Sequence, residues 1–313
     1  MTSPKARPLR HLALVGPTAS GKSALALEVA RRLGGIELVS VDSMQVYRGM
    51  DIGTAKPTAA EQAEVPHHLL DLADPDENFS VARFQVAARA AIAGIEERGH
   101  RALLVGGTGL YVQAVVDELR LPGEWPDVRA ELEAEAMTPA GAAGLHRRLA
   151  ELDPTAAARM EPTNARRIVR ALEVTVASGR PFSSYGPGLD AYPPTRFELI
   201  GVSLPRDIIK GRIATRYEAQ LRRGFVDEVR ALAARPKPLS RTARNALGYR
   251  ELSAHVGGQC SLDEAVTEAV RRTRAFARRQ RVWFRRDARI TWLTADTNPL
   301  AVLPALLGNW AER

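Results

Sequence analysis

Hydrophobic runs of strand length alternate with helical patterns through the first hundred residues. Apolar runs occupy residues 11–16, 36–43 and 101–109, and the residues between them repeat apolar positions at helical spacing. The helical segment 80–99 begins at Ser80, a residue typical of an N-cap. This alternation predicts an α/β fold, with a parallel sheet flanked by helices on both faces.

The chain leaves this pattern in its middle and returns to it later. A fourth strand-like run appears only at 196–204, and the segment before it is rich in Ala, Glu and Arg at helical spacing. We therefore predict an α/β core made of residues 1–120 and 195–313. A helical insertion domain at 121–194 is expected to interrupt it.

A glycine-bounded loop follows the first strand and opens a helix. Its sequence, GPTASGKS, has the spacing of a phosphate-binding P-loop, although a plain strand–helix turn is the alternative. In a P-loop, backbone N–H groups close around phosphate oxygens, Lys22 adds positive charge, and the Ser23 hydroxyl typically binds Mg²⁺. The predicted phosphate-binding residues are Gly16, Pro17, Thr18, Ala19, Ser20, Gly21, Lys22 and Ser23.

The acid that usually accompanies a P-loop is missing from its usual place. In ATPases an Asp at the end of a second apolar strand holds Mg²⁺, but the run at 101–105 ends in GGTG. Asp42 follows the strand-like run before it, and the carboxyl ends of adjacent parallel strands open onto one crevice. Asp42 could bind Mg²⁺, act as a general base or cap the next helix. The polar, glycine-containing loop that follows favours a functional role.

Basic residues are concentrated in the second half of the chain. The net charge is +8, but residues 1–160 carry a net of −4 and residues 161–313 a net of +12. This asymmetry predicts a polyanionic partner, of which nucleic acid is the usual one. A compositional bias toward Arg is the alternative, although it does not explain the crowding into one half.

Two long helices are expected in this basic half, at 206–224 and 261–287. The second contains an arginine-rich stretch that also holds Phe276, Trp283 and Phe284. We expect its arginines to contact phosphates and its aromatic side chains to anchor the core.

Other features narrow the class of protein. The single cysteine, Cys260, excludes a disulfide framework and a Cys-based zinc site. No apolar run is long enough to span a bilayer, so we expect a cytoplasmic protein that does not enter a membrane. His67 and His68 are adjacent and would point to different sides, so we do not expect a metal pair there.

Six blocks occur in order between about Leu12 and about Trp292: GPTASGKS, VSVDSMQVYRGMDIGTAKP, PHHLLDL, LLVGGTGLYVQAV, NARRIVRALEV and ALGYREL. Together they resemble the bacterial tRNA dimethylallyltransferases, also called tRNA isopentenyltransferases. The resemblance implies a P-loop NTPase-like sheet and transfer of a dimethylallyl group from dimethylallyl diphosphate. The acceptor would be N6 of the adenosine at tRNA position 37, and the cofactor Mg²⁺. Eukaryotic members carry a C-terminal zinc finger, which one cysteine cannot form.

The resemblance also implies residue roles. Asp42 would be the general base, and Lys22 and Arg216 would stabilise the leaving diphosphate, with Arg212 a weaker candidate for the arginine. Glycines in the GGTG turn are expected to let it approach a ligand closely. The residues expected to contact tRNA are Asp42, Ser43, Met44, Gln45, Thr108, Arg129, Arg166, Arg167, Arg170, Asn245, Gly248, Tyr249, Arg250, Arg278, Arg279 and Arg285. The expected partner is the tRNA anticodon stem-loop; no protein partner is evident, and the resemblance favours a monomer.

Three other functions remain open. An isopentenyltransferase acting on a free adenine nucleotide would have a similar site, but it has no need for a basic second half. A small-molecule P-loop kinase would need an arginine-bearing lid over ATP, and none is obvious. A non-catalytic RNA-binding protein would leave the Asp42 loop without a purpose.

Overall fold

The computed structural model describes residues 10–138 and 141–311. It divides the chain into two compact units, Met1–Asp117 with Pro194–Arg313, and Glu118–Pro193. The boundaries expected from the sequence, at 121 and 194, fall within a few residues of these. None of the helices in the described ranges has the length and apolar content to cross a membrane.

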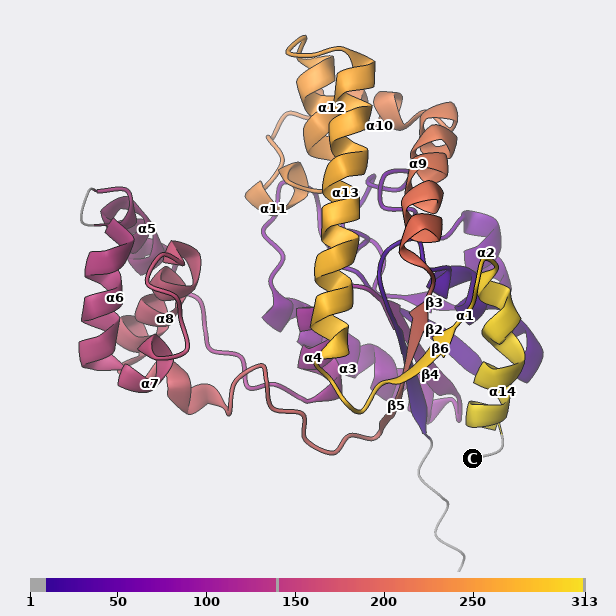
Figure 1. Cartoon of the computed structure of the whole chain (residues 1–313), viewed down its shortest axis with the longest axis horizontal. Helices are drawn as coiled ribbons and strands as arrows, with labels where there is room; N and C mark the ends of the chain where they lie inside the picture. Colours follow the sequence, from indigo (N-terminus) through magenta and orange to yellow (C-terminus); the bar gives the residue numbers. More distant parts are fainter. Residues whose placement is uncertain (1–9, 139–140, 312–313) are drawn as a thin grey trace, which may run out of the picture. The chain divides into compact units, whose positions relative to one another are not determined.

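The larger unit is built on a six-stranded sheet in which all neighbouring strands pair in parallel, in the order β3-β2-β4-β1-β5-β6 (Figure 1). The four central strands correspond to the four apolar runs of the sequence. They are β1 His11–Val15, β2 Ile36–Val41, β4 Arg101–Gly106 and β5 Phe197–Ser203. Their side chains are largely buried on both faces, as expected for a sheet covered by helices on each side.

The two edge strands, β3 His67–His68 and β6 Thr291–Thr294, were not predicted. They are short and carry no apolar run, so nothing in their sequence has the period of a strand. They form because each pairs with one neighbour, β3 with β2 and β6 with β5. Tertiary pairing, not local pattern, decides these edges.

Helices cover both faces of the sheet. On one face α1 Lys22–Leu33 packs on β1, β2 and β4, and on α14 Leu303–Ala311. The crossover from β3 to β4 through α3 Val81–Glu97 runs across the sheet in the opposite direction to the β1–β2 crossover. Since both crossovers are right-handed in such sheets, α3 covers the other face. The remaining short helices around the sheet are α2 Ala59–Glu64, α4 Gly109–Val116 and the 3₁₀ turn Pro299–Val302.

A layer of helices lies between β5 and β6 in the chain. It consists of α9 Arg206–Arg222, α10 Phe225–Ala233, α11 Arg241–Arg244, α12 Tyr249–Val256 and α13 Leu262–Arg285. The two long helices, α9 and α13, pack side by side, with α10 and α12 packed against them (Figure 1). Phe225 and Tyr249 form an edge-to-face aromatic pair between α10 and α12, with ring centroids 4.9 Å apart.

The smaller unit is helical and has its own core. Its helices are α5 Pro126–Ala136, α6 Gly141–Leu152, α7 Pro154–Ala157 and α8 Ala165–Ser178, followed by a 3₁₀ turn at Phe182–Tyr185. Buried apolar side chains of α5, α6 and α8 meet in this core, among them Leu132, Leu145 and Leu172. The buried carboxylate of Glu173 accepts hydrogen bonds from the Arg129 guanidinium at 2.8 and 3.0 Å, which fastens α5 to α8.

Two glycine substitutions should affect stability in opposite directions. A Cβ at Gly106 would lie 2.1 Å from the carbonyl oxygen of Val41, so Gly106→Ala should lower the free energy of unfolding by about 1–3 kcal/mol through overpacking. Gly211 lies inside α9 with open space around it, so Gly211→Ala should raise the free energy of unfolding by about 0.5–1 kcal/mol. Urea denaturation measures both changes. Equal effects of the two substitutions would contradict the packing at the end of β4.

Candidate functional site

The carboxyl ends of the central strands surround a cavity of about 300 Å³. The loop after β1, Asp42 after β2 and the glycines after β4 all line it. Arg212 and Arg216 reach it from α9, which begins just after β5, and Gln280 reaches it from α13. The parallel sheet thus gathers residues from distant parts of the sequence at one edge.

The loop between β1 and α1 has the backbone geometry of an anion-binding turn. Gly16 and Gly21 have φ angles of 144° and 86°, which residues with a side chain rarely adopt. A Cβ at Gly16 would also lie 2.7 Å from the carbonyl oxygen of Val202. Helix α1 begins at Lys22 without a side-chain N-cap, so the N–H groups of its first turn have no capping partner. These N–H groups and the positive end of the helix dipole favour binding of a phosphate.

Lys22 is almost fully buried beneath this loop, with 8 % of its surface exposed. Its ammonium donates to Pro17 O at 2.7 Å and lies 3.5 Å from Ser20 Oγ. Burial lowers the pKa of Lys22 to about 7; the negative charge of Asp42 opposes this shift and the positive charge of Arg216 adds to it. A negatively charged ligand would stabilise the charged form of Lys22 and so raise this pKa.

Arginines from α9 close the other side of the loop. Arg216 donates from its guanidinium to Thr18 Oγ1 at 2.9 Å, and Arg212 Nε donates to Ala19 O at 2.8 Å. The Nε of Arg216 is buried and has no hydrogen-bond partner among the described residues. Burial also lowers the pKa of the Arg216 guanidinium. A buried cation with an unsatisfied donor next to a P-loop is a site prepared for an anion.

Asp42 faces the same cavity from the end of β2. Its Oδ1 accepts hydrogen bonds from the N–H groups of Met44 at 2.8 Å and Gln45 at 3.4 Å, so the carboxylate does cap the following turn. Burial raises its pKa; hydrogen bonds to these N–H groups and the charges of Lys22 and Arg216 oppose the rise. The capping and functional interpretations of Asp42 are therefore compatible, because one oxygen orients the side chain that lines the cavity.

Gln280 is a site residue that the sequence did not reveal. It is buried on α13, and its side-chain amide accepts from Thr18 N at 2.8 Å and donates to Gly107 O at 2.9 Å. It therefore joins the P-loop to the turn after β4. The sequence offered one signal for this role: Gln280 is a single glutamine in an arginine-rich stretch of a long helix. On the same helix Phe284 is a core residue as predicted, whereas Phe276 lines the cavity.

Gly106, the last residue of β4, and Gly107 after it allow close packing within the protein. A Cβ at Gly106 would meet Val41 O, and one at Gly107 would lie 2.3 Å from the Gln280 amide nitrogen. Both glycines also line the cavity, so their close approach to a ligand stays a prediction. Thr108 follows them and its Oγ1 accepts from Ser43 N at 3.3 Å, which ties the β4 turn to the Asp42 turn.

The sixteen residues predicted to contact tRNA differ in exposure: seven have exposed side chains, Gly248 and Tyr249 are buried, and the other seven are half-buried. Those with exposed side chains are Arg166, Arg167, Asn245, Arg250, Arg278, Arg279 and Arg285. Tyr249 is buried and donates its hydroxyl proton to Glu228 at 2.6 Å, and Gly248 is buried at a φ of 86° where α12 begins. These two hold a structural position in this conformation, so a direct tRNA contact remains only a prediction for them.

Arg129 and Arg170 in the smaller unit also have protein partners. Both pair with the buried carboxylate of Glu173, and Arg170 further donates to the carbonyls of Pro122 and Gly123. This pairing holds the 122–125 turn against α8.

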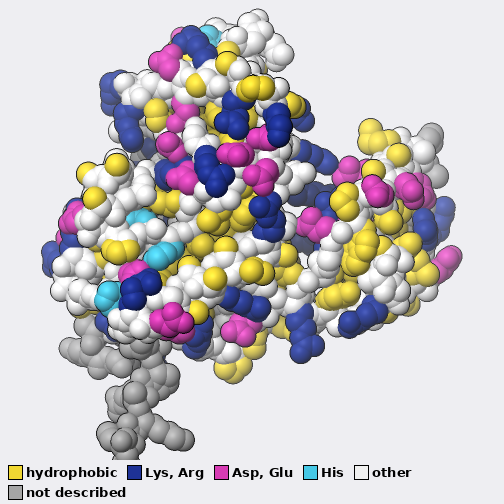
Figure 2. Space-filling model, turned by 180° about the vertical axis from the view of Figure 1, so that it is seen from behind, with side chains coloured by type: hydrophobic (Ala, Val, Ile, Leu, Met, Phe, Trp, Pro, Cys, Tyr) yellow, Lys and Arg dark blue, Asp and Glu magenta, His cyan; other side chains and the backbone are white. Residues whose placement is uncertain are grey.

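On the face shown in Figure 2, basic and acidic side chains alternate over the helical layer of the larger unit at the top of the view. The positive charge of the second half does not form a single uniform patch on that face.

The donors near the P-loop suit Mg²⁺ only together with a bound phosphate. The described part of the chain contains no group of three or more His, Cys, Asp or Glu side chains that could hold a metal ion. Ser23 and Asp42 line the cavity and supply one hydroxyl and one carboxylate. Mg²⁺ binds few protein groups and takes its other ligands from water and phosphate oxygens, so these residues fit it.

Comparisons with known proteins agree on one family. A family model described as IPP transferase matches residues 45–287, and one described as isopentenyl transferase matches residues 10–73. The tRNA dimethylallyltransferase of Streptomyces coelicolor is 50% identical over 304 residues, covering 97% of this chain and 96% of that protein. That of Geobacter metallireducens is 47% identical over 301 residues, covering 96% and 97%.

Solved structures support the same grouping. The crystal structure of the full-length tRNA isopentenylpyrophosphate transferase of Bacillus halodurans has a TM-score of 0.69 and 40% identity, covering 97% of each chain. A eukaryotic dimethylallyltransferase acting on tRNA has a TM-score of 0.78 at 23% identity, covering 96% of this chain and 80% of that one, and so shows likeness of fold alone.

Binding of diphosphate should be coupled to proton uptake by Lys22. With a pKa of about 7 in the free protein, Lys22 is largely neutral at pH 8, and the ligand's negative charge should protonate it. Uptake should therefore be larger at pH 8 than at pH 6, where Lys22 is already charged. Titration calorimetry in buffers of different ionisation enthalpy measures it.

Lys22→Arg is the matched control because its guanidinium stays protonated across this range. The variant accounts for protons taken up by diphosphate itself. Identical proton uptake by the native protein and the variant would show that Lys22 is not the group that titrates.

Proposed function

The chain belongs to the IPP transferase family of tRNA dimethylallyltransferases, and on that premise we propose how it performs the reaction. It transfers a dimethylallyl group from dimethylallyl diphosphate to N6 of the adenosine at tRNA position 37, and releases diphosphate. The observation that carries this proposal is a P-loop with no acid after β4 and with Asp42 across the same cavity. Such a loop suits a ligand that leaves as diphosphate.

The reaction exchanges one bond for another at the allylic carbon. The C1–O bond of dimethylallyl diphosphate breaks, and its electron pair leaves with the diphosphate. The lone pair of N6 forms the new C–N bond, and N6 loses one proton. Negative charge therefore develops on the leaving group, while the acceptor must be deprotonated.

Asp42 is the general base in this proposal. An exocyclic amine is a poor nucleophile because its lone pair is delocalised into the ring, so removal of its proton during attack lowers the barrier. The N–H groups of Met44 and Gln45 hold Oδ1 and orient the carboxylate toward the cavity that it lines. Its raised pKa makes it a stronger base than an exposed aspartate.

The leaving diphosphate is stabilised by preorganised positive charge. The α1 N-terminus, the Lys22 ammonium and the Arg216 guanidinium converge on the P-loop and need little rearrangement to meet developing charge. Arg212 adds a second guanidinium from the same helix. Mg²⁺ would be held by the diphosphate, Ser23 and water, and would neutralise part of the charge.

The tRNA must present a base that is pulled out of its stack. Extraction from the anticodon loop costs a few kcal/mol, because the base is already in a single-stranded region. Exposed arginines on α13, such as Arg278 and Arg279, are suited to hold the phosphate backbone meanwhile. The net charge of +12 in the second half supports a polynucleotide substrate rather than a free nucleotide.

A transfer assay tests this function. The protein is incubated with Mg²⁺ and labelled dimethylallyl diphosphate, together with unmodified tRNA, AMP or no acceptor. We expect label in tRNA and none in AMP, because only the tRNA engages the basic second half. Label in AMP but not in tRNA would replace the proposal with a nucleotide isopentenyltransferase, and ATP consumption without transfer would replace it with a kinase.

Replacement of Asp42 by asparagine should slow the chemical step. Asn keeps an oxygen that can accept from Met44 N but is not a base, so single-turnover transfer should fall by about 10²–10⁴-fold. Diphosphate and tRNA affinities should change little. In the native protein the rate should rise with pH through a pKa above the ordinary aspartate value, and this dependence should vanish in the variant. Loss of tRNA binding in Asp42→Asn would instead make Asp42 structural.

A further inference from the structure

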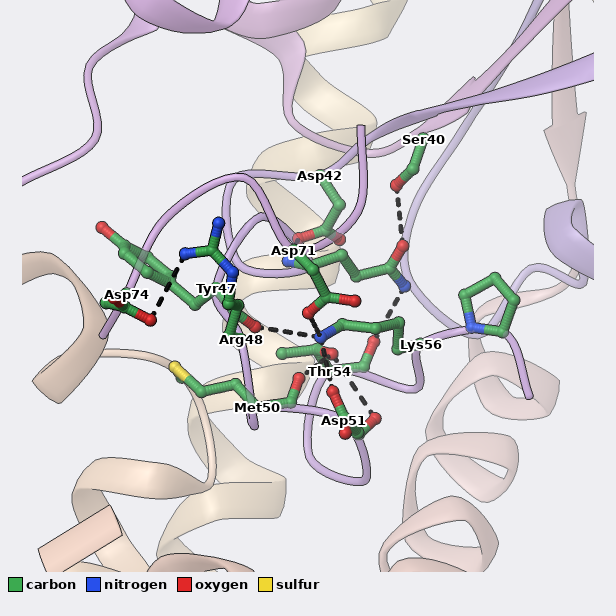
Figure 3. Close-up of polar contacts among 12 residues, drawn as sticks. Ser40, Asp42, Tyr47, Arg48, Met50, Asp51, Thr54, Lys56, Asp71 and Asp74 are labelled. Carbon is green, nitrogen blue, oxygen red and sulfur yellow. Dashed lines mark hydrogen bonds and ion pairs between the residues drawn. The ribbon is translucent and has the colours of Figure 1, made fainter. Parts of the chain in front are cut away.

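A buried lysine lies beneath the loop that follows Asp42. The side chain of Lys56 is only 3% exposed, and its ammonium donates to three acceptors. These are Tyr47 O at 2.9 Å, Asp51 Oδ1 at 2.5 Å and Asp71 Oδ1 at 2.6 Å (Figure 3). All three donors of the ammonium are therefore used.

The three acceptors come from separate segments around the Asp42 turn. Tyr47 ends the turn itself, Asp51 lies in the loop beyond it, and Asp71 follows β3. Backbone hydrogen bonds run alongside, from Asp71 N to Gln45 O and from Ala73 N to Val46 O. Lys56 thus joins the Asp42 turn to the segment after the edge strand β3.

Lys56 also lies next to the residues that bind the Gln45 side chain. The side-chain amide of Gln45 donates to Thr54 O at 3.1 Å and to Ala55 O at 3.2 Å, and its oxygen accepts from Ser40 Oγ at 2.7 Å. Thr54 and Ala55 immediately precede Lys56 in the chain. The position of the 54–56 segment therefore determines where Gln45, one of the two N–H donors to Asp42, is held.

The backbone on both sides of this network is strained. Ala55 and Asp71 have φ angles of 53° and 55°, and Leu69 has 67°. Non-glycine residues adopt this left-handed region at a cost, and they persist there only when the surrounding contacts hold them. Lys56 directly follows Ala55, and its ammonium supplies such contacts to Asp51 before it and to Asp71.

We propose that Lys56 is a positioning residue for the transfer reaction: its ammonium holds the turn that carries Asp42 and Gln45. This inference rests on the proposed role of Asp42 as general base. Lys56 does not touch the substrate in this account, and it acts through the position of the carboxylate. An error of about 1 Å in the position of a reacting group can slow a reaction by roughly 10²-fold.

The loop has a second anchor that does not involve Lys56. Glu228 on α10 accepts from the N–H groups of Asp51, Ile52 and Gly53 at 2.9, 2.7 and 3.1 Å. Loss of Lys56 should therefore loosen the Asp42 turn while residues 51–53 stay attached to the helical layer. Asp51 and Asp71 are 58% and 45% exposed, so water can solvate their carboxylates in a variant without Lys56.

The test compares Lys56→Met with Arg31→Met. Arg31 likewise pairs with two carboxylates, Glu28 and Glu64, but at the far end of α1 from the P-loop. We expect single-turnover transfer to fall by about 10²-fold in Lys56→Met and to stay near the native rate in Arg31→Met. Diphosphate affinity should be unchanged in both. A native rate in folded Lys56→Met would overturn the proposal.

A double variant separates positioning from general loss of structure. In an Asp42→Asn background the base is already absent, so adding Lys56→Met should change the rate by no more than about twofold. An equal, multiplicative loss in both backgrounds would show that Lys56 acts on something other than Asp42. Hydrogen exchange should be faster at Met44 and Gln45 in Lys56→Met, and unchanged exchange there would also overturn the proposal.

If Lys56→Met does not fold, Asp71→Asn carries the same test, because it removes the negative charge from only one of the three ammonium partners. The expected pattern is again a slower rate that disappears in the Asp42→Asn background. A native protein with no transfer activity would reject the proposed function itself, whereas hydrogen exchange would still report on the turn. Failure of the two proposals can therefore be told apart.

Discussion

Parallel pairing of β1 with β4 and β5 is the constraint on which the rest of the structure depends. It brings the carboxyl ends of strands far apart in the sequence to one edge, together with the neighbouring end of β2. The P-loop, Asp42 and the glycine turn at the end of β4 therefore meet at that edge. The helix α9 starts from the same edge and carries Arg212 and Arg216 to the loop.

The site concentrates positive charge that the protein itself only partly balances. Lys22 and Arg216 are both desolvated, and burial lowers the pKa of each. The carboxylate of Asp42 partly compensates for them, yet one donor of Arg216 stays without a partner among the described residues. A diphosphate would complete this charge balance. In the proposed mechanism the same cations, which are costly to bury in the free protein, favour the transition state, in which the leaving group carries more charge.

Two residues support the side of the cavity that Asp42 lines. Glu228 and Lys56 both hold the loop after Asp42 and both contact Asp51. Glu228 accepts from backbone N–H groups, whereas Lys56 donates to carboxylates and a carbonyl. Tyr249 donates to Glu228, so the ALGYREL block of the sequence is linked to the Asp42 loop through a buried contact. This contact accounts for the burial of Tyr249, a residue that is also predicted to contact tRNA.

The sequence by itself determined the four central strands, the long helices, the P-loop and the place of Asp42 at the end of a strand, because apolar runs and glycine spacing act locally. It placed Arg216 beside the P-loop only through resemblance to a family. The edge strands, the bridge made by Gln280 and the burial of Tyr249 were decided by tertiary structure. Each depends on a partner distant in the chain: a neighbouring strand, two loops, or Glu228. No local pattern encodes such a partner, so pairing of distant segments alone fixes which polar side chains face the cavity and which support it.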